Sequence, residues 1–183
     1  SAVVAPVMAY VPEGAIEPAT QHMRYSGTIS IPAPAFEATL EATARSLHRH
    51  GLRDVVFLGD HGGYRASLER VAAKLNREGR GAARVHALPE YYRAAQDDFA
   101  QALAARGFAK GEIGSHAGLA DTALTLALDP SLVRMDLAAA RPRDAQDGVA
   151  GDPRRATAEL GRLGVEHIVD VSVAALRDRL RRP

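Results

Sequence analysis

The chain carries the stretch Val55-Val56-Phe57-Leu58-Gly59-Asp60-His61-Gly62-Gly63-Tyr64 directly before an amphipathic run from Arg65 to Leu75. Four consecutive apolar residues indicate a strand that is buried on both faces, as in a parallel sheet. Glycines directly after such a strand let other groups approach the backbone closely. We therefore expect His61 at the carboxyl end of a parallel strand, where open α/β sheets hold their ligands.

A second histidine-glycine turn supports the same expectation. It consists of Gly114-Ser115-His116-Ala117-Gly118-Leu119-Ala120-Asp121-Thr122 and lies at the start of another patterned segment. Two such turns in one short chain favour a functional site over two unrelated core histidines.

The composition fits a single globular domain. The chain has 183 residues, of which 46% are hydrophobic, and it contains no apolar run long enough to span a membrane. Its formal net charge of +1 gives no reason to expect nucleic acid as a partner. Because the chain has no cysteine, any bound metal must be held by His, Asp or Glu side chains.

Strand and helix patterns alternate along the chain. We expect strands at about 2–8, 28–31, 54–58 and 84–88. We expect helices at about 34–50, 64–78, 95–106 and 118–128, with loops at 107–114 and 141–151. An N-cap at Asp152 then opens a C-terminal helix that we expect to be interrupted near Gly161 and Gly164. This order predicts an α/β fold whose mainly parallel sheet is covered by helices.

The histidine turns offer candidate site residues. His61 suits a metal ligand or a general base, although a helix-capping histidine explains its position equally well. Asp60 suits a ligand or a group that orients His61, and the role of helix N-cap explains it slightly better. His116 and Asp121 suit a base and a metal-binding carboxylate for hydrolysis by metal-activated water, and a capping arrangement explains their spacing as well. His22 is a candidate for lining the same pocket, although loop histidines are more often simple polar surface.

Several catalytic signatures are absent from the sequence. It has no G-x-S-x-G nucleophile elbow, because the serine in Gly114-Ser115-His116-Ala117-Gly118 stands one place early. Neither a P-loop nor a G-x-G-x-x-G motif follows a predicted strand. Metal-assisted hydrolysis is the chemistry that the remaining residues match best.

The chain resembles the creatininase (creatinine amidohydrolase) family over nearly its whole length. Its Gly59–Tyr64 stretch falls where the family has Asn-Gly-His-Gly-Gly-Asn, and His116–Thr122 resembles the family's His-Ala-Gly-x-x-Glu-Thr. Two further segments, Tyr25–Ser30 and Gly148–Glu159 with Gly161, resemble its aromatic-Pro-Gly-Thr-Ile-Ser and Gly-Val-x-Gly-Asp-Pro…Ala-Thr-x-Glu-x-Gly segments. Four signatures in the right order are far more specific than any one of them.

The resemblance implies a three-layer α/β/α fold, a homo-oligomer that is often a hexamer, and one or two divalent ions, zinc or manganese, at the sheet edge. It implies hydrolysis of a small cyclic or linear amide by attack of metal-bound hydroxide on the amide carbon. Carried over residue by residue, it makes His61 and Asp121 metal ligands and His116 the catalytic histidine that relays a proton to the leaving nitrogen. It also makes substrate-binding residues of His22, Asp60, Tyr64 and Ser115.

The chain also departs from the family pattern. The family's upstream Glu-x-His segment is missing, so we expect a single creatininase-like domain that lacks its N-terminal strand and part of its metal ligands. Asp121 replaces a glutamate and Tyr64 replaces an asparagine. These changes indicate a substrate other than creatinine, or a catalytically impaired relative that binds a small ligand or serves as a structural subunit. An anion-binding module built on Gly62 and Gly63 ranks last.

The expected partners and location follow from the same resemblance. We expect a small-molecule amide as substrate and no association with nucleic acid or membranes. The family favours the cytoplasm, while a start without methionine leaves a periplasmic or secreted location open.

Overall fold

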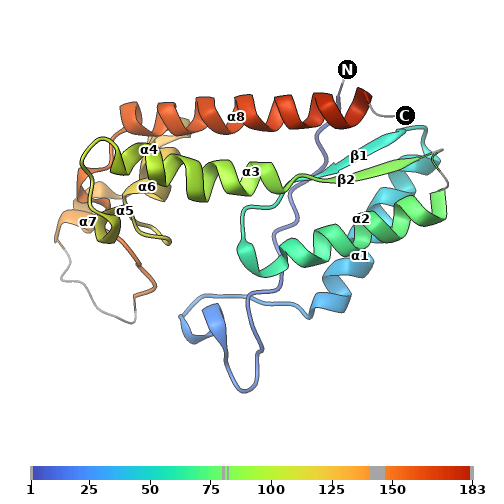
Figure 1. Cartoon of the computed structure of the whole chain (residues 1–183). Coiled ribbons are helices and arrows are strands. Elements are labelled where there is room, and N and C mark those ends of the chain that lie inside the picture. The colour runs from blue at the N-terminus through green and yellow to red at the C-terminus, as the bar shows by residue number, and fades with distance from the viewer. Residues whose placement is uncertain (1, 80, 82, 141–146, 182–183) are drawn as a thin grey trace. The chain divides into compact units, whose positions relative to one another are not determined.

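The computed structural model describes residues 2–79, 81, 83–140 and 147–181, which form two compact units (Figure 1). The first unit extends to Ala87 and the second begins at Leu88. Among the described residues, no helix combines the length and apolar character needed to cross a membrane.

The first unit is built on a βαβ arrangement. Strands β1 (Asp54–Phe57) and β2 (Arg84–Ala87) are parallel, with a register that runs from Asp54 opposite Arg84 to Phe57 opposite Ala87. Helix α2 (Arg65–Gly79) makes the crossover between the two strands, as parallel pairing requires. Helix α1 (Ala33–Arg49) precedes β1, and two short 3₁₀ turns complete the unit: η1 (Gln21–Arg24) and η2 (Gly62–Tyr64).

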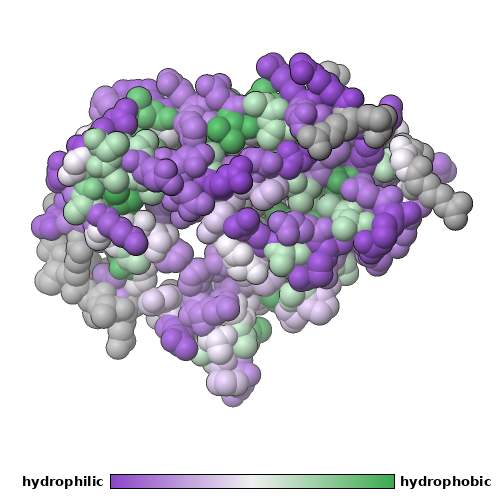
Figure 2. Space-filling view, viewed as in Figure 1, coloured by the Kyte–Doolittle hydropathy of each residue, from purple (hydrophilic) through white to green (hydrophobic). Residues whose placement is uncertain are grey.

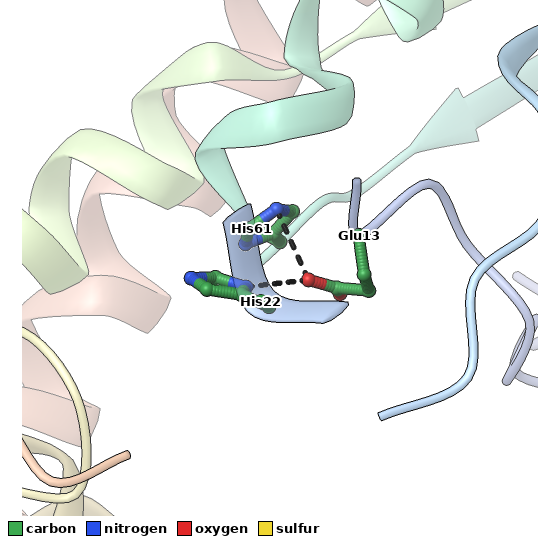
Figure 3. Close-up of side chains that lie close together, drawn as sticks. All are labelled: Glu13, His22 and His61. Carbon is green, nitrogen blue, oxygen red and sulfur yellow. Dashed lines mark hydrogen bonds and ion pairs between the residues drawn. The ribbon is translucent and has the colours of Figure 1, made fainter. Parts of the chain in front are cut away.

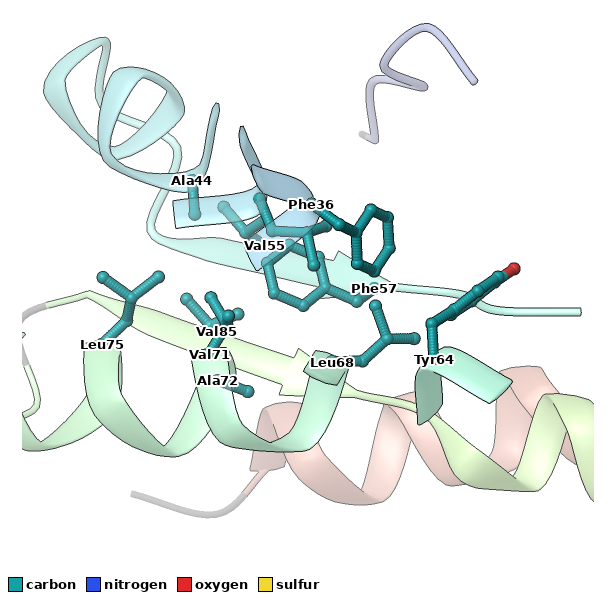
Figure 4. Close-up of a cluster of buried hydrophobic side chains, with 11 residues drawn as sticks. Phe36, Ala44, Val55, Phe57, Tyr64, Leu68, Val71, Ala72, Leu75 and Val85 are labelled. Carbon is teal, nitrogen blue, oxygen red and sulfur yellow. The ribbon is translucent and has the colours of Figure 1, made fainter. Parts of the chain in front are cut away.

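One continuous core holds this unit together (Figure 4). Helix α1 contributes Phe36, Leu40 and Ala44, which recur every fourth residue and therefore share one helix face. Both α1 and α2 pack against the strands and against each other, so they cover the same face of the sheet within this unit. The buried members of the core are Phe36, Leu40, Ala44, Val55, Phe57, Tyr64, Leu68, Val71, Ala72, Leu75 and Val85.

A charged network joins the two strands at their first residues. Arg84 Nε donates to Asp54 Oδ1 over 2.7 Å, and His86 Nε2 lies 2.9 Å from the same oxygen. Burial acts to raise the pKa of Asp54, but hydrogen bonds from Arg84 and His86 outweigh it and hold this pKa below its usual value. The network therefore stabilises the register of β1 against β2 while Asp54 is ionised.

Replacing Asp54 by asparagine is expected to lower the free energy of unfolding at pH 7 by about 1.5–3 kcal/mol, the usual range for hydrogen bonds to charged groups. Because the folded-state pKa is depressed, this contribution is present above the unfolded value of 3.8 and is lost as the pH falls through the folded pKa. Urea unfolding of both proteins at pH 7 and pH 2.5 measures it. The exposed Asp170→Asn variant is the control, and an equal loss at both pH values would contradict the assignment.

The second unit is helical in its described residues. Its elements are α3 (Pro89–Arg93), the π-helical η3 (Ala94–Asp98), α4 (Phe99–Ala104), α5 (Lys110–Ile113), α6 (Leu119–Leu128), η4 (Pro130–Leu132), α7 (Met135–Ala140), η5 (Pro153–Arg155) and α8 (Ala158–Arg181). Helix α8 packs along α6, and its buried residues are Gly161 and Gly164. Its outer side mixes hydrophobic and hydrophilic side chains, as Figure 2 shows, with Val169 about half exposed at 52%.

Two predicted strands are absent from the structure. Residues 2–8 and 28–31 form no strand, and Val4 and Val7 are 92% and 91% exposed. A β-branched apolar run needs a neighbouring strand to form a ladder, and among the described residues only β1 and β2 pair in this way. The Ile31 N–H donates to the Val11 carbonyl over 3.2 Å, which is a single contact and not a ladder. The expectation of a core strand at 2–8 and of a short strand at 28–31 was wrong.

The helical predictions need smaller corrections. Helix α8 is continuous, so the interruption expected near Gly161 and Gly164 was wrong; both glycines are sites of close packing and not breaks. Short helices α5 and α7 occupy parts of the chain where no helix was predicted. The predicted loop at 141–151 falls partly on residues 141–146, which lie outside the described residues.

Candidate metal centre

His61 lies at the start of the 3₁₀ turn that leads into α2, as its N-cap residue. Its backbone is extended, which continues the direction of β1 through the link formed by Leu58, Gly59 and Asp60. A Cβ atom on Gly63 would lie 2.4 Å from His61 Nε2, so glycine at that position leaves the space that the imidazole occupies. The glycine turn thus positions a half-buried histidine beside the carboxyl end of a strand.

A loop held by hydrogen bonds brings Glu13 and His22 close to His61. The backbone N–H of Glu13 donates to Ser30 Oγ over 2.9 Å, and that hydroxyl donates to the Gly14 carbonyl over 2.8 Å. The backbone N–H of His22 donates to the Glu13 carbonyl over 3.1 Å. Because Ser30 is buried, these bonds anchor the loop at the edge of the core.

Glu13, His22 and His61 form a compact cluster (Figure 3). Glu13 Oε2 lies 2.6 Å from His22 Nδ1 and 3.4 Å from His61 Nε2, and the two imidazole rings are 4.9 Å apart between centroids. One potential ligand atom from each residue lies within 4.8 Å of the other two. One carboxylate therefore faces two imidazole nitrogens in a partly buried position.

The donor set fits a divalent cation of the zinc type. Two imidazoles and one carboxylate are ligands that zinc accepts in catalytic sites, where three protein ligands leave a further position open. Manganese also accepts carboxylate ligands. The Glu13 carboxylate already bridges both histidines, so a cation at this point would take over contacts that now join the three side chains. The residues present thus fit a metal centre.

Asp60 and Tyr64, both predicted to bind substrate, are hydrogen-bonded to each other. The Tyr64 hydroxyl donates to Asp60 Oδ1 over 2.5 Å and accepts from the Asp60 backbone N–H over 3.1 Å. Tyr64 is buried, with its ring 5.5 Å from that of His61. Burial, followed by the neighbouring Asp60 carboxylate, raises the pKa of the Tyr64 phenol strongly, so the hydroxyl stays protonated and able to donate.

The second histidine turn lies in the second unit. The backbones of His116 and Ala150 form an antiparallel bridge, with Ala150 N–H donating to the His116 carbonyl over 2.8 Å. The N–H of Ser115 donates to the Ala150 carbonyl over 2.7 Å, and Asp121 Oδ2 accepts from Ala117 N–H over 3.0 Å. The side chains of Ser115 and His116 are exposed at the surface of this unit.

Three glycines explain why the segments 114–118 and 150–151 meet here. A Cβ atom on Gly114 would lie 2.0 Å from the Ala150 carbonyl oxygen, and one on Gly118 would lie 2.5 Å from that of Ile113. Gly151 approaches the same two glycines through its backbone. Only glycine allows this backbone crossing, which fixes the turn that carries His116.

Asp121 is half-buried at the start of α6. Burial raises the pKa of its carboxyl group, and this effect outweighs the opposing influence of the Ala117 N–H, of His116 and of Gln96. Gln96 belongs to the π-helical turn η3, a feature that often accompanies functional sites. A carboxyl group whose pKa is raised by burial beside a histidine is typical of functional sites.

Replacing Asp121 by asparagine is therefore expected to increase the free energy of unfolding of the metal-free chain at pH 7. Because the folded-state pKa is raised, the wild-type carboxylate loses stability as the pH rises above the unfolded value of 3.8. The advantage of the variant should disappear below that pH, where the carboxyl group is protonated in both states. Urea unfolding across this range measures the difference, and a variant that is less stable at pH 7 would contradict it.

The structure groups some predicted residues and adds others. It brings His22 and His61 together and adds Glu13, which was not predicted. His116, Ser115 and Asp121 lie in one turn of the second unit. The sequence offered little signal for Glu13, since it stands nine residues before His22 in a loop without periodic pattern. Gln96 was also missed, because a π-helical turn leaves no simple sequence pattern.

A parallel βαβ unit with a histidine-carboxylate cluster beside the strand end defines an α/β protein with a candidate metal centre. The family model for creatininase, described as creatinine amidohydrolase, matches residues 1–176. The chain belongs to the creatininase family, as its motifs predicted. The α/β fold class is confirmed as well.

Relatives agree with this placement. A mycofactocin precursor peptide peptidase from Mycolicibacterium smegmatis (strain ATCC 700084 / mc(2)155) is 31% identical over 199 aligned residues, which cover 99% of this chain and 67% of the relative. The crystal structure of creatinine amidohydrolase (creatininase) superposes with a TM-score of 0.73 at 24% identity, over 97% of this chain and 75% of that one. A glutamate-to-glutamine variant of creatininase, of the Zn-Zn type, gives a TM-score of 0.67 at 24% identity, over 87% and 69%. These structures establish the shared fold.

Proposed function

We propose that the chain hydrolyses the C–N bond of a small cyclic or linear amide at a divalent cation, zinc or manganese, held by Glu13, His22 and His61. The cluster of these three side chains carries the proposal, because it joins two imidazoles and a carboxylate within 4.8 Å. Membership of the creatininase family supports the reaction class.

A bound divalent cation polarises a carbonyl group and lowers the pKa of water. The chain's own residues orient the ligand side chains and supply a proton to the leaving nitrogen. Glu13 orients both imidazoles through its Oε2 atom, and Ser30 holds the backbone of Glu13 in place. The family motif alone motivates two further assignments: His116 transfers a proton to the leaving nitrogen, and Asp121 is a ligand of a second ion. Within its own turn, the Asp121 carboxylate accepts a hydrogen bond from the Ala117 N–H.

The test combines metal analysis with a substrate panel. The purified chain, loaded with zinc or manganese, is offered creatinine, linear amides and short peptides, and the released amine is measured. Hydrolysis of an amide that occurs only when the metal is present supports the proposal. Stoichiometric metal without hydrolysis of any substrate would overturn it in favour of a small-ligand-binding relative.

His116→Ala tests the proton-transfer role separately. We expect hydrolysis to fall by about 100-fold or more, within the usual contribution of general acid–base catalysis, while metal content is unchanged. The exposed His50→Ala variant is the matched control, because it also removes a histidine. Equal activity of the two variants would remove His116 from the mechanism.

A second candidate substrate is a peptide. The relative from M. smegmatis is a precursor peptide peptidase, and it shares 31% of its aligned residues with this chain. Cleavage of the short peptides in the panel, without cleavage of the small amides, would favour this candidate.

A further inference from the structure

The Asp60–Tyr64 pair encloses the turn that carries His61. The Tyr64 hydroxyl reaches back over the turn and contacts both the carboxylate and the backbone N–H of Asp60. One hydroxyl therefore holds Asp60 through two different groups, which indicates that the two residues act as one joint device.

Packing holds the tyrosine ring in place. Tyr64 is 6% exposed, and its ring lies 5.2 Å from that of Phe36 on α1. A Cβ atom on Gly59 would lie 2.8 Å from Tyr64 Cε2, so the ring fills the space above that glycine. Packing in the core therefore holds the ring of Tyr64, and the hydrogen bond to Asp60 holds its hydroxyl.

We propose that the Asp60–Tyr64 pair is a positioning clamp that sets the direction of the His61 imidazole toward Glu13. His61 is the first of the three residues between the clamped ends, and its ring lies 5.5 Å from that of Tyr64. With Asp60 held through its side chain and its backbone N–H, the residue that directly precedes His61 is fixed at the turn. The positioning of the His61 ring does not depend on the proposed function. Only the statement that His61 Nε2 binds a cation rests on it.

This inference gives Asp60 and Tyr64 a role different from the substrate binding predicted for them. The hydroxyl and the carboxylate contact each other, and neither belongs to the cluster formed by Glu13, His22 and His61. They act on the cluster through His61, in the way that groups around a metal site orient its ligands.

The first arm of the test measures cation affinity. Cobalt(II) is titrated into the whole wild-type chain and into Tyr64→Phe, Asp60→Asn and the double variant, and its visible absorption is recorded. We expect each single variant to bind about 10–100-fold more weakly, as for other groups that orient metal ligands. The double variant should be no weaker than the weaker single variant, because one joint contact is lost only once. Tyr10→Phe, at a 60% exposed tyrosine, is the control.

The second arm needs no metal. In metal-free protein, the imidazole proton signals of His61, assigned with His61→Ala, report its surroundings by nuclear magnetic resonance. We expect Tyr64→Phe to shift or broaden the His61 signals while those of exposed His50 stay in place. Thermal unfolding confirms that the variants are folded, and Asp60→Asn provides a second probe because Asp60 is exposed.

The two arms separate this inference from the proposed function. Unchanged His61 signals in Tyr64→Phe would overturn the clamp even if the chain hydrolyses amides. Fully additive losses of cobalt affinity in the double variant would also overturn it. A wild-type chain that binds no cobalt would overturn the metal centre, while a changed His61 signal would still support the clamp.

Discussion

Replacing His61 by alanine is expected to remove the bound cation and to lower amide hydrolysis by more than about 100-fold. Mutation of a group that only orients a metal ligand typically lowers metal affinity or activity by about 10–100-fold. Because His61 itself supplies a ligand atom, its loss should have a larger effect. Its Nε2 atom lies 3.4 Å from the Glu13 carboxylate oxygen, which would then face only one imidazole. Metal content per chain by mass spectrometry, together with the rate of amine release, measures both effects.

Matched variants decide whether the three side chains hold one ion. Glu13→Gln and His22→Ala should reproduce the loss seen in His61→Ala, because each removes one of the three grouped donors. His50→Ala should retain both metal and activity. Full metal content in Glu13→Gln and His22→Ala would show that the ion is held elsewhere.

Replacing Gly161 by alanine is expected to cost about 2 kcal/mol or more of unfolding free energy, since overpacking typically costs 1–3 kcal/mol. A Cβ atom at this position would lie 1.8 Å from the Ala123 carbonyl oxygen and 2.4 Å from its carbon. Both atoms belong to the backbone of α6, so relief requires that α6 and α8 move apart. The better helix propensity of alanine, about 1 kcal/mol, offsets only part of this cost.

Gly111→Ala supplies the control for this prediction. Gly111 lies in helix α5, and a Cβ atom there would meet nothing within 4 Å. Urea unfolding should show this variant at least as stable as the wild type, because only the helix propensity changes. If the two alanine variants have equal stability, the close crossing of α6 and α8 does not constrain position 161.

The sequence predicted those elements whose pattern is set locally. The α1 face of Phe36, Leu40 and Ala44 repeats every fourth residue, β1 contains consecutive β-branched residues, and β2 is a short run that ends close to a proline. The prediction failed for residues 2–8, where the same kind of run pairs with no strand in the part of the chain that the structure describes. It also failed at Gly161, because a helix glycine required by a close crossing cannot be distinguished from a helix break without knowing what packs there.

Within the candidate site, the sequence predicted only the part that lies at the glycine turn. The pattern around His61 predicted a residue at a strand end, and the structure places it there. Glu13 could not be found in the same way, because its approach to His61 depends on a loop held by the distant Ser30. The contact between Asp60 and Tyr64 was equally hidden, since each residue alone has an ordinary capping or packing explanation.

The loop anchored at Ser30 and the turn after β1 meet at the three cluster side chains. An ion bound there would link segments that are distant in the sequence, and it would bind the folded chain in preference to the unfolded one. At a free concentration one hundred times its dissociation constant, such a ligand adds about 2.7 kcal/mol to stability. The lifetime of this protein against proteases would then follow the supply of the ion in its surroundings, so that scarcity of metal would lower its abundance as well as its activity.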